Sequence, residues 1–184
     1  MHCFLTFDGA PDSPHTEKVL DVLSAHGVKA TFFVEGHRIP QGAALLGRIV
    51  AEGHGLGNHS YSHEIMLPMS LEETRAEVML CEEKIYRAVG LRPTIVRPPW
   101  GKIRQDQARM LMDLGYEIIC WNMSVRDWEA SDSRQLAGRL VEYACPWMVP
   151  VMHDAVGVVP GALDLAIPVL REKGYSFFRV DAFV

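Results

Sequence analysis

The chain has 184 residues, of which 48% are hydrophobic and 22% are charged. This balance is typical of a soluble globular protein, and we expect residues 1–184 to form one domain. The net charge of -5 gives no electrostatic reason to bind nucleic acid or an anionic membrane. No apolar run approaches the roughly 20 residues that span a bilayer. Met1–Phe7 carries no signal-peptide features. That favours the cytoplasm, although a secreted protein trimmed to its mature start has the same appearance.

Short apolar runs rich in β-branched and aromatic residues alternate along the chain with stretches of helical periodicity. The first half predicts, in order, a strand over His2–Phe7, a helix capped by Ser13 with Pro14 first and Gly27 after its end, a strand over Ala30–Val34, a helix over Gln41–Glu52, a strand over His54–Asn58 and a helix between Ser70 and Gly90. The second half predicts a strand over Thr94–Val96, a helix over Gln105–Leu114, a strand over Tyr116–Trp121, a helix over Asp132–Tyr143, a strand over Met148–Met152, a helix over Gly161–Lys173 and a strand over Tyr175–Val180.

Six strand–helix units followed by a seventh strand predict an α/β fold with a parallel sheet, because each helix returns the chain to start the next strand. Seven strands can close into a small barrel or remain an open sheet, and periodicity alone does not decide between them.

Ionisable and aromatic residues follow these strands at their carboxyl ends. They are Asp8, His59, His63, Arg97, Asp127, Trp128, His153 and Asp154. Because the carboxyl ends of parallel strands lie on one face, where such folds place their sites, we expect these side chains to converge.

The residue types indicate acid–base and metal chemistry. If the chain turns helically between His59 and His63, both imidazoles can chelate one metal ion; the alternative is a pair of hydrogen-bonded histidines. His153 is suited to general acid–base work, with Asp127 to orient it, although a histidine bonded to a core carbonyl has the same pattern. Arg97 keeps its proton and can clamp a carboxylate.

Five motifs in order resemble those of the polysaccharide deacetylase family, also called the NodB homology domain or carbohydrate esterase family 4. Thr6–Pro11 is similar to its TFDDGP, His59–His63 to its H(S/T)xxH, Arg97–Gly101 to its RPPYG, Arg126–Trp128 to its aspartate–tryptophan motif and Val151–His153 to its LxH. The resemblance implies a distorted seven-stranded (β/α) barrel.

The resemblance also implies metal-dependent hydrolysis of an amide, most simply the N-acetyl group of a sugar. A divalent metal, commonly zinc or cobalt, would be held by His59 and His63. Asp8 would be the general base, tethered by Arg97.

The family's remaining motifs imply an acid and a binding pocket. His153 would protonate the leaving amine while Asp127 keeps it charged. The backbone N–H of Trp100 would help bind the oxyanion, and Trp128 and Val151 would enclose the acetyl methyl.

The sequence departs from the family at Gly9, which stands where the family has its metal-binding aspartate. Asp8 could turn to bind the metal, or Asp12 or His15 could reach the site. Alternatively water fills the position, and the metal is weakly bound or absent. A carboxylate introduced at Gly9 is expected to complete the site.

Three functions therefore stay open: deacetylation of an N-acetylated saccharide, hydrolysis of another small amide or ureide, or binding of a saccharide or partner by a degenerate barrel. Gly9 favours the third function, whereas retention of the other motif residues favours the first two. Oligomeric state is undecided.

Overall fold

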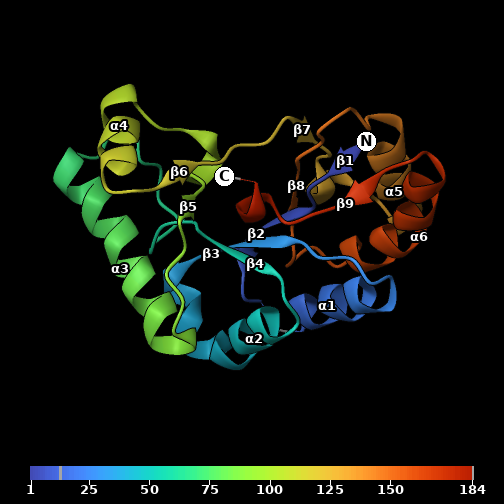
Figure 1. Cartoon of the computed structure of the whole chain (residues 1–184), viewed down its shortest axis with the longest axis horizontal. Helices are drawn as coiled ribbons and strands as arrows, with labels where there is room; N and C mark the ends of the chain where they lie inside the picture. The colour runs from blue at the N-terminus through green and yellow to red at the C-terminus, as the bar shows by residue number, and fades with distance from the viewer. Residues whose placement is uncertain (13, 184) are drawn as a thin grey trace.

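The structure, a computed structural model, describes residues 1–12 and 14–183 (Figure 1). Its main sheet has seven parallel strands in the order β6-β5-β4-β3-β2-β8-β7. The strands are β2 (Thr6–Ala10), β3 (Thr31–Val34), β4 (Gly55–Asn58), β5 (Ile95–Val96), β6 (Glu117–Ile118), β7 (Met123–Ser124) and β8 (Pro150–His153). The sheet curls into a distorted (β/α) barrel whose two edges, β6 and β7, are consecutive in the chain. The α/β barrel expected from the sequence is therefore confirmed.

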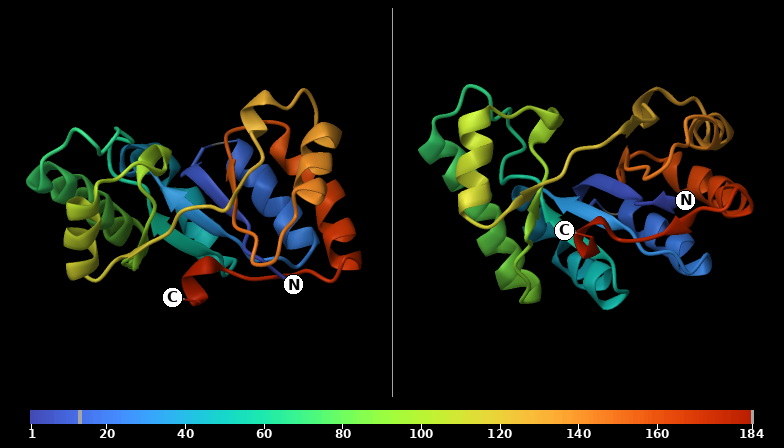
Figure 2. Two further views of the ribbon diagram at one scale, coloured as in Figure 1. Left: turned by 90° about the horizontal axis from the view of Figure 1, so that it is seen from above. Right: turned by 45° about the horizontal axis from the view of Figure 1, so that its top comes forward.

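The helices surround this sheet, with α3 and α4 at one end and α5 and α6 at the other (Figures 1 and 2). Their bounds are α1 His15–Ala25, α2 Ile39–Ala51, α3 Leu71–Val89, α4 Gln105–Asp113, α5 Ser133–Glu142 and α6 Val159–Glu172. Short 3-10 helices cover Gly36–Arg38, Pro99–Gly101, Asp127–Glu129 and Val180–Ala182. None of the helices in the described part of the chain combines the length and apolarity needed to cross a bilayer.

Two of the predicted strands differ from the observed ones. The first splits, so that β1 (His2–Cys3) pairs with β9 (Ser176–Phe177) in a separate two-stranded sheet. The predicted last strand is therefore not the seventh strand of the main sheet. That place belongs to β7, whose two residues are too few to produce a visible periodicity.

Helix ends follow the capping chemistry predicted from the sequence. At α3, Ser70 and Glu73 form the expected capping box, and Gly90 ends the helix with a φ of 72°. The Asp132 side chain accepts from the backbone N–H at the start of α5. The predicted cap Ser13 lies outside the described residues, and Pro14 is the N-cap of α1 rather than its first helical residue.

Candidate active site

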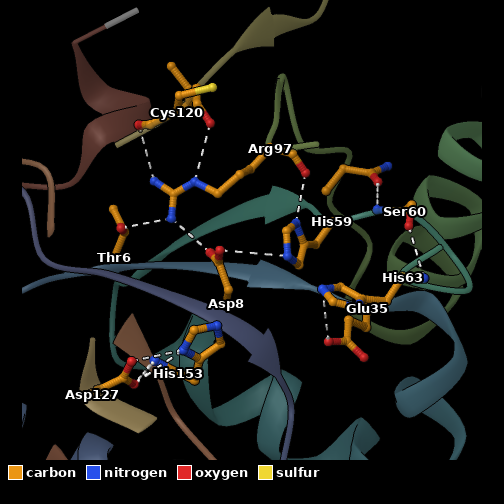
Figure 3. A network of polar contacts seen from close by, with 12 residues as sticks. Thr6, Asp8, Glu35, His59, Ser60, His63, Arg97, Cys120, Asp127 and His153 are labelled. Carbon is orange, nitrogen blue, oxygen red and sulfur yellow. Dashed lines mark hydrogen bonds and ion pairs between the residues drawn. The ribbon is translucent and has the colours of Figure 1, made fainter. Parts of the chain in front are cut away.

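The ionisable residues predicted from the strand ends do converge on one face of the sheet (Figure 3). Asp8 lies in β2 and His153 ends β8, so that the two are partners in the register of these neighbouring strands. A cavity of about 420 Å³ opens here. It is lined by Asp8, His59, His63, Trp100, Trp121, Ser124, Trp128, Val151, His153 and Val156.

A buried ion pair joins Asp8 to Arg97, the residue after β5. The Arg97 Nη1 donates to Asp8 Oδ1 at 2.7 Å and to Thr6 Oγ1 at 2.9 Å. Arg97 is 0% exposed and Asp8 is 3% exposed. Burial raises the pKa of the Asp8 carboxyl, but the charges of Arg97 and His59 outweigh burial and lower that pKa overall. Asp8 is therefore a carboxylate at neutral pH.

His59 follows β4 and presents a neutral imidazole to Asp8. Its Nδ1 lies 2.7 Å from the carbonyl oxygen of Arg97, which can only accept, so Nδ1 carries the proton. Its Nε2 lies 3.6 Å from Asp8 Oδ2. Burial is the main cause of the lowered pKa of His59. A neutral imidazole whose other nitrogen donates to a backbone carbonyl is the form that binds metals.

The turn between His59 and His63 is not helical, although the sequence prediction of metal chelation assumed a helical turn there. Ser60 and His63 have φ values of 66° and 62°, in the left-handed region. The two histidine rings nevertheless lie side by side, with centroids 4.9 Å apart. The Ser60 backbone N–H donates to Asn58 Oδ1, and Ser60 Oγ accepts from the His63 N–H. These bonds replace the i to i+4 geometry of a helix.

His153 and Asp127 form a second pair. The His153 Nδ1–H faces both Asp127 carboxylate oxygens at 3.1 and 3.2 Å, and the His153 backbone N–H donates to Asp127 Oδ2 at 2.7 Å. Burial lowers the pKa of His153, but the hydrogen bond and charge of Asp127 outweigh it, and the pKa is raised overall. Asp127 thus favours the imidazolium form of His153.

Aromatic side chains wall the cavity between these groups. Trp128 meets the His153 ring edge-on at a centroid distance of 5.6 Å, and Trp100 lies 5.8 Å from the His63 ring. Val151, in β8, also lines the cavity. Trp100, expected to bind the oxyanion, therefore borders the same space as Trp128 and Val151, expected to enclose the acetyl methyl.

Gly9 stands where the family has its metal-binding aspartate, and its backbone conformation is unusual. Gly9 has a φ of 98°, which side chains rarely adopt, and β2 shifts its register against β3 between Asp8 and Ala10. A Cβ at Gly9 would lie 3.4 Å from Glu35 Oε1 and 3.7 Å from Asp154 Oδ1. The backbone therefore strains any side chain at position 9, whereas both neighbouring oxygens stand at ordinary contact distance. That a carboxylate at Gly9 would complete the site stays a prediction.

Asp12 and His15 do not meet the paired histidines in the described part of the chain. Asp12 Oδ2 accepts from Arg38 Nη1 at 2.7 Å, and Asp12 Oδ1 lies 3.3 Å from His15 Nδ1. No ready-made cluster of three metal-binding side chains is present among the described residues. Two imidazole side chains next to carboxylates nevertheless form a donor set suited to zinc.

Glu35 is a site residue that the sequence reasoning missed. It directly follows β3, and its Oε1 lies 4.0 Å from His63 Nε2. The signal was available, since an ionisable residue at the end of a buried strand is the same pattern that identified Asp8 and His153. Glu77 of α3 was also missed: its carboxylate accepts from the backbone N–H groups of Tyr61 and Ser62 and so anchors the histidine turn.

The family model described as polysaccharide deacetylase matches residues 2–119. The chain belongs to the polysaccharide deacetylase family. A peptidoglycan-N-acetylglucosamine deacetylase of Bacillus cereus is 34% identical over 182 residues, which are 97% of this chain and 66% of that protein. The chain thus spans just under two thirds of that relative's length.

Solved structures of family members superpose closely on the chain. The Bc1960 peptidoglycan N-acetylglucosamine deacetylase, in complex with 4-naphthalen-1-yl-N-oxidanyl-benzamide, has a TM-score of 0.95 at 31% identity, covering 98% of this chain and 86% of that one. BA3943 of Bacillus anthracis, described as a CE4 family pseudoenzyme, has a TM-score of 0.92 at 28% identity, covering 99% of this chain and 64% of that one. A mutant of BA3943 is described as having restored enzymatic activity. The fold thus accommodates both active and inactive sites.

Proposed function

We propose that this chain is a metal-dependent hydrolase that removes acetyl groups from N-acetylated saccharides. One observation carries the proposal: three groups of side chains border a single cavity. They are Asp8, hydrogen-bonded to Arg97; His153, hydrogen-bonded to Asp127; and the pair His59 and His63. The relative from Bacillus cereus is a peptidoglycan-N-acetylglucosamine deacetylase, which supports N-acetylglucosamine oligomers as the substrate class.

A divalent metal, zinc or cobalt, would be held by His59 and His63 and would supply polarisation of the amide carbonyl and acidification of the attacking water. His59 is prepared for this role by the bond from Nδ1 to the Arg97 carbonyl, which leaves Nε2 without a proton. The donor set thus fits a divalent ion.

Asp8 and His153 divide the proton transfers. Asp8 is a carboxylate whose Oδ1 is fixed by Arg97, so Oδ2 accepts the proton of the attacking water. The His153 Nδ1–H donates to Asp127, which stabilises the imidazolium form, and Nε2–H supplies the proton for the nitrogen of the departing amine. The opposed directions of the two pKa shifts, Asp8 lowered and His153 raised, suit a base and an acid in one site.

The cavity walls select the group that is cleaved. Val151 and Trp128 provide an apolar surface for the acetyl methyl, and the exposed Trp100 offers its backbone N–H to the oxyanion and its ring to a sugar. A cavity volume of about 420 Å³ suits a ligand of about one or two sugar rings.

Acetate release from chitooligosaccharides tests the proposal. The wild type should release acetate, and Asp8→Asn should reduce turnover by roughly 10²-fold or more because the base is lost. Asp164→Asn is the matched control, because Asp164 is exposed and pairs with His26 rather than with the cavity groups. Equal rates for wild type and Asp8→Asn would contradict the assignment.

Gly9 favours a second candidate, a barrel that binds saccharide without turnover. Its sequence signature is the absent ligand, and BA3943 is a family member described as a pseudoenzyme. Saccharide binding by calorimetry with no acetate release under any metal condition would select this function.

A further inference from the structure

We propose that Glu35 replaces the missing family aspartate as the carboxylate ligand of the metal site. The inference rests on the proposed metal dependence and assigns the third ligand that the sequence left open.

Glu35 reaches the place of the absent aspartate from the neighbouring strand. Its backbone N–H donates to the Ala10 carbonyl at 3.0 Å, which continues the β2–β3 ladder past the shift in register at Gly9. Its Oε1 lies 3.4 Å from where a Cβ at Gly9 would be. A side chain at position 9 would therefore enter the space that Glu35 borders. The absence of a side chain at Gly9 leaves that space to the glutamate.

The separation of Glu35 from His63 is close to that of two ligands of one ion. Zinc bonds of about 2.0–2.2 Å in a tetrahedral arrangement place ligand atoms about 3.4 Å apart. Glu35 Oε1 lies 4.0 Å from His63 Nε2. The side chains of Glu35 and His63 point toward each other beside His59 (Figure 3). A shift of a few tenths of an ångström would bring the carboxylate and the imidazole to one ion.

The second carboxylate oxygen of Glu35, Oε2, accepts a hydrogen bond from an outer group, as metal-binding carboxylates commonly do. Glu35 Oε2 accepts from Arg38 Nε at 2.6 Å, and Arg38 Nη1 donates in turn to Asp12 at 2.7 Å. Outer groups of this kind fix the orientation of a ligand. Asp12, one of the expected ligands, thus acts on the site through Arg38 and Glu35.

Assigning Glu35 to the metal leaves Asp8 available as base. Asp8 Oδ1 is committed to Arg97, and only Oδ2 faces His59. If Asp8 had to complete the metal site, its free oxygen would be used twice. With Glu35 as ligand, the two carboxylates keep separate tasks.

Zinc titration of the metal-free protein by calorimetry tests the assignment without any substrate. Glu35→Gln should weaken zinc binding about 10-fold or more, since losing even an outer group costs roughly 10–100-fold. Glu64→Gln removes an exposed carboxylate next to His63 and should leave zinc affinity unchanged. Arg38→Gln, which keeps Glu35 but removes its partner, should give a smaller loss than Glu35→Gln.

Asp154→Asn separates Glu35 from the other carboxylate near Gly9. If Asp154→Asn loses zinc while Glu35→Gln keeps it, Asp154 is the ligand and the assignment is overturned. If Glu35→Gln does not fold, a crystal structure of the wild type with zinc decides. It should show Glu35 Oε1 at about 2.0–2.2 Å from the ion. An ion bound by Asp8 or water, with Glu35 still paired only with Arg38 and His37, would overturn the proposal.

The outcomes also distinguish this inference from the proposed function. Zinc binding that depends on Glu35 without acetate release would uphold the ligand assignment and refute the hydrolase. Zinc-dependent acetate release with equal zinc affinity in wild type and Glu35→Gln would do the reverse.

Discussion

Arg97→Met is expected to be strongly destabilising, because it leaves the Asp8 carboxylate buried without its partner. At the 2.7 Å separation of Nη1 and Oδ1, the gross attraction is about 6 kcal/mol for an effective dielectric of about 20. Much of this offsets the cost of removing both charges from water. Removing one member of a buried pair typically costs about 3–5 kcal/mol, a large part of a total stability of about 5–15 kcal/mol.

A double-mutant cycle isolates the pair from the packing of Arg97 over the Phe33 ring. Urea unfolding at pH 7 with chelator would be measured for Arg97→Met, Asp8→Asn and the double variant. The double variant leaves neither charge buried alone. Its loss in free energy of unfolding should therefore be smaller than the sum of the two single losses, by at least about 2 kcal/mol.

Arg87→Met provides the control, because its ion pair with Glu83 is exposed and should contribute less than about 1 kcal/mol. If Arg97→Met costs no more than Arg87→Met, or if the single losses simply add, the electrostatic account of Asp8 is wrong.

Three further changes probe the rest of the site. His153→Ala should lower turnover on chitooligosaccharides by roughly 10²-fold or more, because the general acid is lost. Asp127 raises the pKa of His153. Asp127→Asn should therefore move the basic limb of the profile of kcat/KM against pH to lower pH. Burial raises the pKa of Asp154 from 3.8 to about 7. The contribution of Asp154 to stability is therefore complete below about pH 4 and is lost as the pH rises to about 7. Asp154→Asn should accordingly flatten the pH dependence of the free energy of unfolding in the metal-free protein. Gly9→Asp should lower the melting temperature, at a cost of about 1 kcal/mol or more for a side chain at a φ of 98°.

Each of these has a clear opposing result. A basic limb unmoved by Asp127→Asn would mean that another group sets it. A wild type whose stability does not fall between about pH 4 and 7 would show that Asp154 titrates normally, because the hydrogen bond from Thr16 then outweighs burial. A Gly9→Asp variant of wild-type stability would show that the backbone relaxes there.

The convergence of the site could be predicted from sequence because parallel strands place their carboxyl ends together. The same rule predicts that Asp8, His59, Arg97 and His153 lie on one face. The capping box at Ser70 could be predicted because its chemistry is local, involving residues three apart.

The remaining features depend on contacts that local patterns do not encode. Strand β7 has two residues and exists through its pairing with β8. The approach of His63 to His59 depends on left-handed backbone at Ser60 and His63, which no spacing rule indicates. The role proposed for Glu35 depends on the shift in register beside Gly9, a property of two paired strands rather than of either sequence.

The central claim is that this chain hydrolyses N-acetyl groups with a bound divalent metal, and metal removal and restoration test it most directly. Protein purified to homogeneity would be stripped with chelator and assayed for acetate release from chitooligosaccharides before and after zinc is added. We predict that chelation abolishes acetate release and that zinc restores it in the wild type but not in His59→Ala. Acetate release that is indifferent to chelation, or its absence at every zinc and cobalt concentration, would contradict the account.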